Sequence, residues 1–275
     1  MLPSPYRWPS VPMSDCSDAE CAAEDDAGDP RLEQYVRRHP SGNGRGEVLL
    51  IGVAHDHPAS VARVAHIMDA VAPDVLALEL PSLAIPLFRQ YAGDEYVPPR
   101  LGGEMSTAIQ RAGDVRTVGI DGPNPAYFRR LVQRVVGERI STEDLREVVG
   151  DVARGTGQAL ACRVGAVIAR LTPITPKVYT HITYDCASFD SPSAQARHER
   201  NHVAQRQAFL RVVELPRSTT LIDEVREETM ATRLAELLST SDVVAVIGIE
   251  HLDELSERLA DEAGSMGAID EIDCS

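Results

Sequence analysis

The sequence contains no hydrophobic segment long enough to cross a membrane. Its longest apolar runs, Val48–Ala54 and Val243–Ile249, have seven residues each, whereas a helix that spans a bilayer needs about 20. No apolar run follows Arg7, the first positive charge, so we do not expect a secretory signal peptide either. The chain is therefore expected to be a soluble protein without a membrane span.

Positive charge is scarce, and lysine is almost absent. Lys177 is the only lysine, and 42 acidic residues against 27 basic ones give a formal net charge of −15. A field this negative repels phosphate backbones, so we expect no nucleic-acid partner. An acidic, lysine-poor surface is also typical of proteins in a salt-rich cytoplasm, where salt screens the self-repulsion. The composition therefore suggests a halophilic source.

Cysteine is present, but without the spacing of a disulfide framework or a thiolate zinc site. The five cysteines form no Cys-x-x-Cys pair. Cys16 and Cys21 lie in a polar segment, and Cys274 is next to the end of the sequence. Because nothing indicates disulfide pairing or export, we expect a cytoplasmic protein.

Length and composition predict one large domain with polar ends. The chain has 275 residues, of which 43% are hydrophobic and 25% charged, which is enough apolar material for a core. Residues 1–46 contain a proline-rich start, an acidic run and a turn cluster, and we interpret them as a disordered tail. Within it, Pro30–Arg38 is the one candidate for a short helix. The folded domain is expected over 47–265, with a second tail over 266–275.

Four apolar runs of strand length predict the core of the fold. They are rich in leucine and β-branched residues, as in strands buried on both faces, and cover Glu47–Val53, Val75–Leu80, Val115–Ile120 and Val243–Ile249. Between the first two, Ala59–Val71 has apolar residues at helical spacing. A strand, a helix and a strand in succession form a βαβ unit. We therefore predict an α/β fold with a mixed, mainly parallel central sheet flanked by helices.

The middle of the chain is almost entirely helical in pattern. We predict a helical insertion over 131–215, before the last core strand, with an irregular segment at Thr172–Ser191 inside it. The expected helices cover 126–137, 142–153, 158–171, 193–214, Leu221–Leu238 and Leu252–Ala263.

The two strongest apolar strands both run into a Gly-x-x-His motif. The first is Gly52 to His55 and the second is Gly248 to His251. Ligands of open α/β sheets bind outside the carboxyl ends of the strands, so the two imidazoles could converge there if the strands are neighbours. The alternative for each histidine is a cap or a packed residue at the start of the following helix.

Glu79 strengthens the case for a site at this edge. It stands near the end of an apolar strand, where a buried carboxylate needs a partner. Two imidazoles and a carboxylate are a common set of ligands for a catalytic divalent cation, so we predict His55, His251 and Glu79 as metal ligands. His57, two residues after His55, is a candidate accessory ligand. The alternative for Glu79 is a salt bridge to an arginine.

At these residues the sequence resembles the TraB/PrgY family of pheromone-shutdown proteins, whose wider clan includes the Tiki metalloproteases. The similarity covers about 47–130 and 221–255. The motifs that carry it are Gly52-Val53-Ala54-His55 with Ser60, Pro73-Asp74 with Glu79-Leu80, Gly102-Gly103-Glu104-Met105 with Ala108, Asp121 with Arg129-Arg130, Arg226 with Met230-Ala231, and Gly248-x-x-His251.

The resemblance implies a metal-dependent hydrolase with peptidase-like activity and a divalent cation such as manganese, cobalt or zinc. It also implies site roles for residues outside the ligand set, namely Glu79, Arg226, Glu104, Arg129 and Arg130. A carboxylate would act as base and an arginine would stabilise the oxyanion. The chain departs from the family at His57, Gly122 and Val225, and it lacks the transmembrane C-terminus of some members.

A competing motif lies in the helical insertion. His198-Glu199-Arg200-Asn201-His202 matches His-Glu-x-x-His, which on a helix places two histidines on one face to bind zinc, with the glutamate as base. Glu224 or Glu227 would be the third ligand. The surrounding segment is strongly polar, so we favour a solvated helix.

The sequence thus leaves two hypotheses of different kinds. The first is a TraB-like hydrolase with a peptide or small-molecule substrate. The second is a non-catalytic regulatory or peptide-binding protein on the same fold, with the helical insertion as its interaction surface. A homo-oligomer is left open in both cases.

Overall fold

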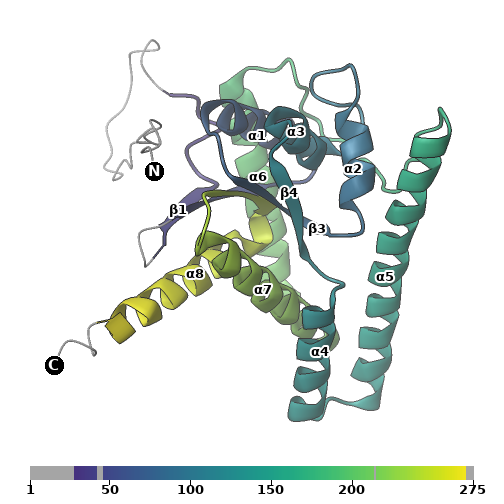
Figure 1. Ribbon diagram of the computed structural model, residues 1–275, viewed down its shortest axis with the longest axis vertical. Coiled ribbons are helices and arrows are strands. Elements are labelled where there is room, and N and C mark those ends of the chain that lie inside the picture. The colour runs from purple at the N-terminus through teal and green to yellow at the C-terminus, as the bar shows by residue number, and fades with distance from the viewer. Residues whose placement is uncertain (1–27, 42–45, 214, 271–275) are drawn as a thin grey trace.

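The computed structural model describes residues 28–41, 46–213 and 215–270, and it has a five-stranded sheet at its centre (Figure 1). The strand order is β1-β2-β5-β3-β4; β1 is antiparallel to β2, and the other neighbours are parallel. The strands are β1 (Val36–Pro40), β2 (Glu47–Val53), β3 (Val75–Pro81), β4 (Arg116–Asp121) and β5 (Val243–Gly248). The predicted α/β fold with a mixed, mainly parallel sheet is confirmed.

The first and last core strands lie side by side. β2 pairs with β5 in parallel, with Gly52 opposite Ile247 and Val53 opposite Gly248. All of β5 and all but the first residue of β2 are buried, as their continuous apolar character predicts. The two Gly-x-x-His motifs therefore leave neighbouring strands at the same edge of the sheet.

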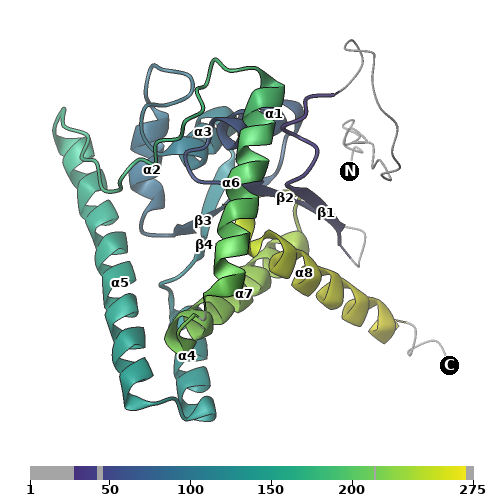
Figure 2. The ribbon, with the colours of Figure 1, turned by 180° about the vertical axis from the view of Figure 1, so that it is seen from behind.

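Helices cover both faces of the sheet (Figures 1 and 2). Alternate residues of β2 point to opposite sides, so that Leu49 and Ile51 enter one core cluster and Val48 and Leu50 the other. The first cluster includes residues of α1 (Pro58–Ala70), α2 (Ile85–Ala92) and α3 (Gly103–Ala112). The second includes residues of α7 (Arg217–Leu238) and α8 (Ile249–Asp270).

The segment between β4 and α7 is the predicted helical insertion, with one difference. It contains α4 (Pro125–Glu138), α5 (Thr142–Leu171) and α6 (Pro192–Val212). The expected break between 142–153 and 158–171 is wrong, because α5 runs without interruption through Gly155 and Gly157. Its buried face packs against α2 and α7, and this packing outweighs the low helix propensity of glycine.

The ends of the domain also differ from the sequence interpretation. The short helix expected at Pro30–Arg38 is wrong: Val36–Pro40 is strand β1, which pairs with the edge of β2. The sheet thus begins inside the segment interpreted as a tail, and α8 extends to Asp270. The tail interpretation of 1–27 and 271–275, together with Cys16, Cys21 and Cys274, lies outside the described residues.

Among the helices of the described part, none is both long and apolar enough to cross a membrane.

Candidate active site

Side chains from the carboxyl ends of four strands meet in a polar network. His55 follows β2, Glu79 lies in β3, Asp121 ends β4 and His251 follows β5. The parallel register brings these ends to one edge of the sheet, as predicted for the two histidines and the glutamate. The network falls into two carboxylate–histidine pairs and an ion-pair cluster around Arg226.

The first carboxylate–histidine pair joins His55 to Glu104. The Nδ1 atom of His55 lies 2.5 Å from Oε1 of Glu104, whose side chain is only 3% exposed. The second oxygen, Oε2, accepts a hydrogen bond from the backbone N–H of Asp56 at 2.9 Å. The hydrogen bond to Glu104 raises the pKa of His55 to about 9, against the opposing effect of burial, and the charges of Glu79 and Glu250 add to the rise. His55 is thus an oriented imidazolium at neutral pH.

The backbone at Gly103, next to Glu104, packs closely against Asp56, next to His55, and this contact positions the pair. Gly103, at the start of α3, has a φ of 48°, and a Cβ there would lie 2.4 Å from Oδ1 of Asp56. Asp56 itself has a φ of 62°, in the left-handed region that aspartate tolerates better than most residues. Its Oδ2 accepts a hydrogen bond from the N–H of Ile182 at 3.0 Å. The positive φ and the close approach of Asp56 both favour glycine at 103, next to Glu104.

Glu79 is paired with an arginine, which is the alternative that its sequence context left open. Its Oε1 lies 2.7 Å from Nη2 of Arg226, and its Oε2 accepts a hydrogen bond from the N–H of Gly248 at 2.6 Å. The same Nη2 lies 2.9 Å from Oδ2 of Asp121. Burial lowers the pKa of Arg226, but the charges of Asp121 and Glu79 more than offset this and raise it. The guanidinium is a fixed cation between two carboxylates.

The second carboxylate–histidine pair joins His251 to Glu227 of α7. The Nδ1 atom of His251 donates to Oε1 of Glu227 at 2.8 Å. Its Nε2 lies 3.4 Å from Nη1 of Arg226 and 3.5 Å from Oε1 of Glu79. Burial alone would lower the pKa of His251, but the hydrogen bond to Glu227 and the charge of Glu79 outweigh it, so the pKa is raised. Glu227 was expected only as a zinc ligand for the competing motif, and it holds this imidazole instead.

Glu250 is a site residue that the sequence analysis missed. A Cβ on Gly248 would lie 2.9 Å from Oε2 of Glu250 and 3.3 Å from Oε2 of Glu79, so both carboxylates border the same glycine. Burial raises the pKa of Glu250, but its backbone hydrogen bond, Arg206 and the two site histidines outweigh this and lower it. The signal was available, because Glu250 stands inside the second Gly-x-x-His motif.

Two apolar cavities adjoin the polar network. One of about 490 Å³ is lined by His55 and Glu250, with Tyr184 and residues of α6 such as Phe209 on its walls. The other, of about 410 Å³, reaches Asp121 and Arg226 and has the buried face of α5 as a wall. An apolar group of a ligand bound in either cavity would therefore lie next to charged side chains of the network.

The four predicted metal ligands do not form one ligand shell. In the described part of the chain, the only three His, Cys, Asp or Glu residues whose ligand atoms lie within 4.8 Å of one another are His57, Cys186 and His198. Of the predicted set, only His57 belongs to this group. At Glu79 and His251 the neighbouring charge is that of Arg226, which opposes a second cation.

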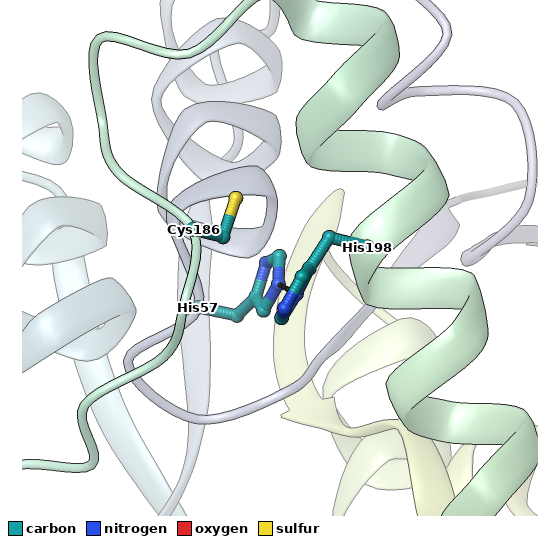
Figure 3. A group of neighbouring side chains, drawn as sticks. All are labelled: His57, Cys186 and His198. Atoms are coloured by element: carbon teal, nitrogen blue, oxygen red, sulfur yellow. Dashed lines mark hydrogen bonds between the residues drawn. The ribbon is translucent and has the colours of Figure 1, made fainter.

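The His57–Cys186–His198 cluster could hold a metal ion (Figure 3). His57 is fully buried, and its Nδ1 accepts a hydrogen bond from the N–H of Ala59, which caps α1. Its Nε2 therefore carries the proton and donates to Nδ1 of His198 at 3.0 Å. Burial, with the charges of His198 and His202, lowers the pKa of His57 to about 4. The ring is thus neutral in this hydrogen-bonded arrangement, and a metal ion would have to take the place of the proton on Nε2.

The His-Glu-x-x-His motif lies on α6 but is not arranged as a zinc-binding helix. Glu199 is buried in a salt bridge with Arg63 of α1 and accepts a hydrogen bond from Oγ of Ser60 at 2.5 Å. His198 stacks on His57, whereas His202 packs against the ring of Tyr184. The first half of α6 is therefore docked on α1, which corrects the interpretation as a solvated helix; the second half is exposed. Nothing in the sequence marked Arg63 as a buried cation.

The remaining predicted residues lie away from the histidines. Arg130 donates to Oγ1 of Thr232 on α7 at 2.8 Å, and Arg129 is exposed on α4. Glu224, the other candidate zinc ligand, forms a salt bridge with Arg217 at 2.8 Å.

Comparison with known proteins gave no identification: no family model, no curated protein and no solved structure matches the chain.

Proposed function

We propose that the protein is a cytoplasmic, TraB-like hydrolase whose reaction centre comprises His55, Glu79, His251 and Glu250. The observation that carries this proposal is the pair of neighbouring strands, β2 and β5, each followed by a histidine that a carboxylate holds through Nδ1, buried Glu104 for His55 and half-buried Glu227 for His251. This arrangement leaves Nε2 of His55 for chemistry, whereas Nε2 of His251 lies against Arg226 and Glu79. Oriented carboxylate–histidine pairs are typical of general acid–base catalysis.

The chemistry proposed is addition of water to a carbonyl of a peptide or ester. Glu250 takes a proton from water, whose oxygen attacks the carbonyl carbon, and His55 gives its proton to the leaving nitrogen or oxygen as that bond breaks. Both line the same cavity. The Glu79–Arg226–Asp121 cluster stays fixed and supplies a preorganised field. Proton exchange with solvent then restores both groups.

The test is a hydrolysis screen with fluorogenic peptides and p-nitrophenyl esters. We expect His55→Gln to lose about 100-fold or more of the activity, the usual contribution of a general acid or base. His66→Gln, an exposed histidine on α1, is the matched control and should keep it. Activity that disappears with EDTA and returns with manganese or cobalt would contradict acid–base catalysis and favour the metal-dependent reaction that the resemblance implies.

The alternative is the non-catalytic, peptide-binding protein. It predicts no turnover of any probe, together with binding of the same peptides that is unaffected by His55→Gln. Turnover that depends on His55 would exclude it.

We propose in addition a zinc ion at His57, Cys186 and His198. Two imidazoles and a thiol favour zinc over manganese, which prefers oxygen ligands. An ion there would tie α6 and the irregular segment before it to the start of α1 (Figure 3).

The zinc test is metal analysis of the purified protein. Cys186→Ser should remove stoichiometric zinc, whereas Cys162→Ser, at a free cysteine buried between α5 and α2, should not. A zinc content near zero in the unmodified protein would overturn this site and leave the hydrolase proposal intact.

A further inference from the structure

Helix α5 exposes an apolar stripe along the face that points away from the sheet. Its inner face is buried against the body of the protein, while the outer face carries Val149, 59% exposed, Val164, 58% exposed, and Leu171, 77% exposed. In both ribbon views α5 lies at the outer edge of the molecule (Figures 1 and 2). Exposed apolar side chains concentrated on one helix face are typical of an interaction surface.

The stripe is regular. Its members follow one another at intervals of three or four residues in an 11-residue pattern, which gives about 3.67 residues per turn and keeps the stripe nearly straight on an α-helix. They are Leu145, Val149, Ala153, Leu160, Val164, Val167 and Leu171; the remaining position of the pattern is the half-buried Thr156, which also borders the cavity at Arg226.

The same helix is close to self-complementary when reversed. Its midpoint falls between Thr156 and Gly157. In two antiparallel copies crossing at that midpoint, Val149 of one copy faces Val164 of the other. Leu145 likewise faces Ile168, and Ala153 faces Leu160. Apolar residues thus face one another at these positions, with Thr156 and Gly157 at the crossing, whereas Val167 faces Arg146 and Leu171 faces Thr142 toward the ends.

The charges of α5 favour the same orientation. The N-terminal half carries Glu143, Asp144, Glu147 and Asp151 against Arg146 and Arg154, and the only charged residues of the C-terminal half are Arg163 and Arg170. An antiparallel arrangement places Glu143 opposite Arg170 at both ends of the contact. A parallel arrangement would align like charges. In a chain of net charge −15, such complementarity is needed for two copies to approach.

We propose that two copies of this chain pair antiparallel through α5, about a two-fold axis at Thr156 and Gly157. The contact is isologous, so it closes as a dimer and leaves no free copy of the surface. The inner face of α5 lines the cavity that reaches Arg226, so pairing would also hold this wall in place. The proposal does not depend on the hydrolase assignment.

Sedimentation of the full chain over a range of concentrations tests the pairing. The unmodified protein should be a dimer, and Val164→Glu should be monomeric with an unchanged helical content by circular dichroism. Val212→Glu is the matched control, because Val212 is 87% exposed but lies on α6. A monomeric unmodified protein, or a Val164→Glu variant that still dimerises, would overturn the proposal.

Charge exchange tests the orientation. Arg170→Glu and Glu143→Arg should each weaken dimerisation by about tenfold or more, because each places like charges at both ends of the contact. A mixture of the two variants should regain dimers, since every facing pair is then of opposite sign. A mixture no tighter than either variant alone would rule out the antiparallel register. A monomer that instead pellets with anionic lipid vesicles through Val164 would assign the stripe to a membrane surface.

Discussion

At the scale of single residues, the site depends on pairs in which each side chain needs the other. The carboxylate needs a compensating charge, and the histidine needs a partner that fixes its orientation. Glu104 is buried next to His55, and its two oxygens are taken up by the ring and by the N–H of Asp56. Without the imidazolium the carboxylate would be a buried, uncompensated charge. Without Glu104 the ring would be free to rotate. The pair is therefore the residue-scale unit that orients His55.

The first prediction concerns the titration of His55. Its pKa is raised from the model-peptide value of 6.5 to about 9, mainly by Glu104, with Glu79 and Glu250 contributing. The pair's contribution to stability should therefore be complete below pH 6.5 and be lost as the pH rises through about 9. NMR of the imidazole, with His55→Gln for assignment, measures this. Glu104→Gln should bring the midpoint down toward the ordinary value; a midpoint unchanged by that substitution would mean that another group holds the proton.

The second prediction concerns Gly248. Adding a Cβ there would place it 2.9 Å from Oε2 of Glu250 and 3.3 Å from that of Glu79, so Gly248→Ala should displace both carboxylates. We expect loss of hydrolysis with the fold retained. Gly137→Ala on α4 is the control, because its Cβ would meet nothing within 4 Å, and it should stabilise the helix by about 0.5–1 kcal/mol. Full activity in Gly248→Ala would remove these carboxylates from the reaction centre.

The sequence was informative about residues at strand ends and uninformative about residues that act from helices. His55, Glu79 and His251 were placed because a strand end fixes where a side chain emerges. Glu227 and Arg63 were not, because their partners are reached by helix packing between segments far apart in the chain. Periodicity gives the face of a helix but not what lies against it.

At the scale of elements, α6 is attached to the core by a buried ion pair. Arg63 of α1 and Glu199 of α6 are each about 1% exposed, and Arg63 also donates to the backbone carbonyl of Gly52 at 2.9 Å. Such a pair contributes little net stability compared with an apolar replacement, but it is costly to break from one side. The docking of α6 is thus sensitive to single substitutions.

The third prediction follows from this attachment. Glu199→Leu should lower the free energy of unfolding by about 3–5 kcal/mol, because it leaves the buried guanidinium unpaired. The double variant Arg63→Met/Glu199→Leu should recover most of that loss. Denaturant unfolding measures both. Glu236→Ala is the control: its pair with Arg233 is exposed and should matter by less than about 1 kcal/mol. Equal losses in the single and double variants would show that burial of the pair is not the cause.

The continuous helix α5 shows where element prediction from sequence fails. The Arg154–Gly157 segment has two glycines and predicts a break. Buried residues on either side of it, Val148 and Cys162, belong to core clusters that include residues of α7 and α2 respectively, so both halves are held in line. Each glycine lowers the stability of a helix by about 1 kcal/mol, and the packing of the buried residues stabilises α5 by more than that.

At the scale of the whole molecule, the net charge affects stability through the sum of many distant interactions and not through any single contact. The net charge of −15 means that compaction brings like charges together, while many of the arginines are already committed to ion pairs such as Arg226–Asp121 and Arg134–Glu228. Those pairs neutralise carboxylates at the site and at helix contacts but leave the surplus of acid on the surface. We therefore expect long-range repulsion between acidic residues to limit the stability of the folded state. Salt screens this repulsion, whereas it has little effect on the buried ion pairs.

The fourth prediction is that the melting temperature rises with sodium chloride between about 0.05 and 1 M, as the Debye length falls from above 10 Å to about 3 Å. Most of the gain should occur early in this range, since screening of distant charges is nearly complete before 1 M. Sucrose, which stabilises compact states without screening, is the control that separates the two effects. A melting temperature that falls with salt would mean that surface ion pairs outweigh the net repulsion, and would remove the physical basis for inferring a salt-rich environment from the composition.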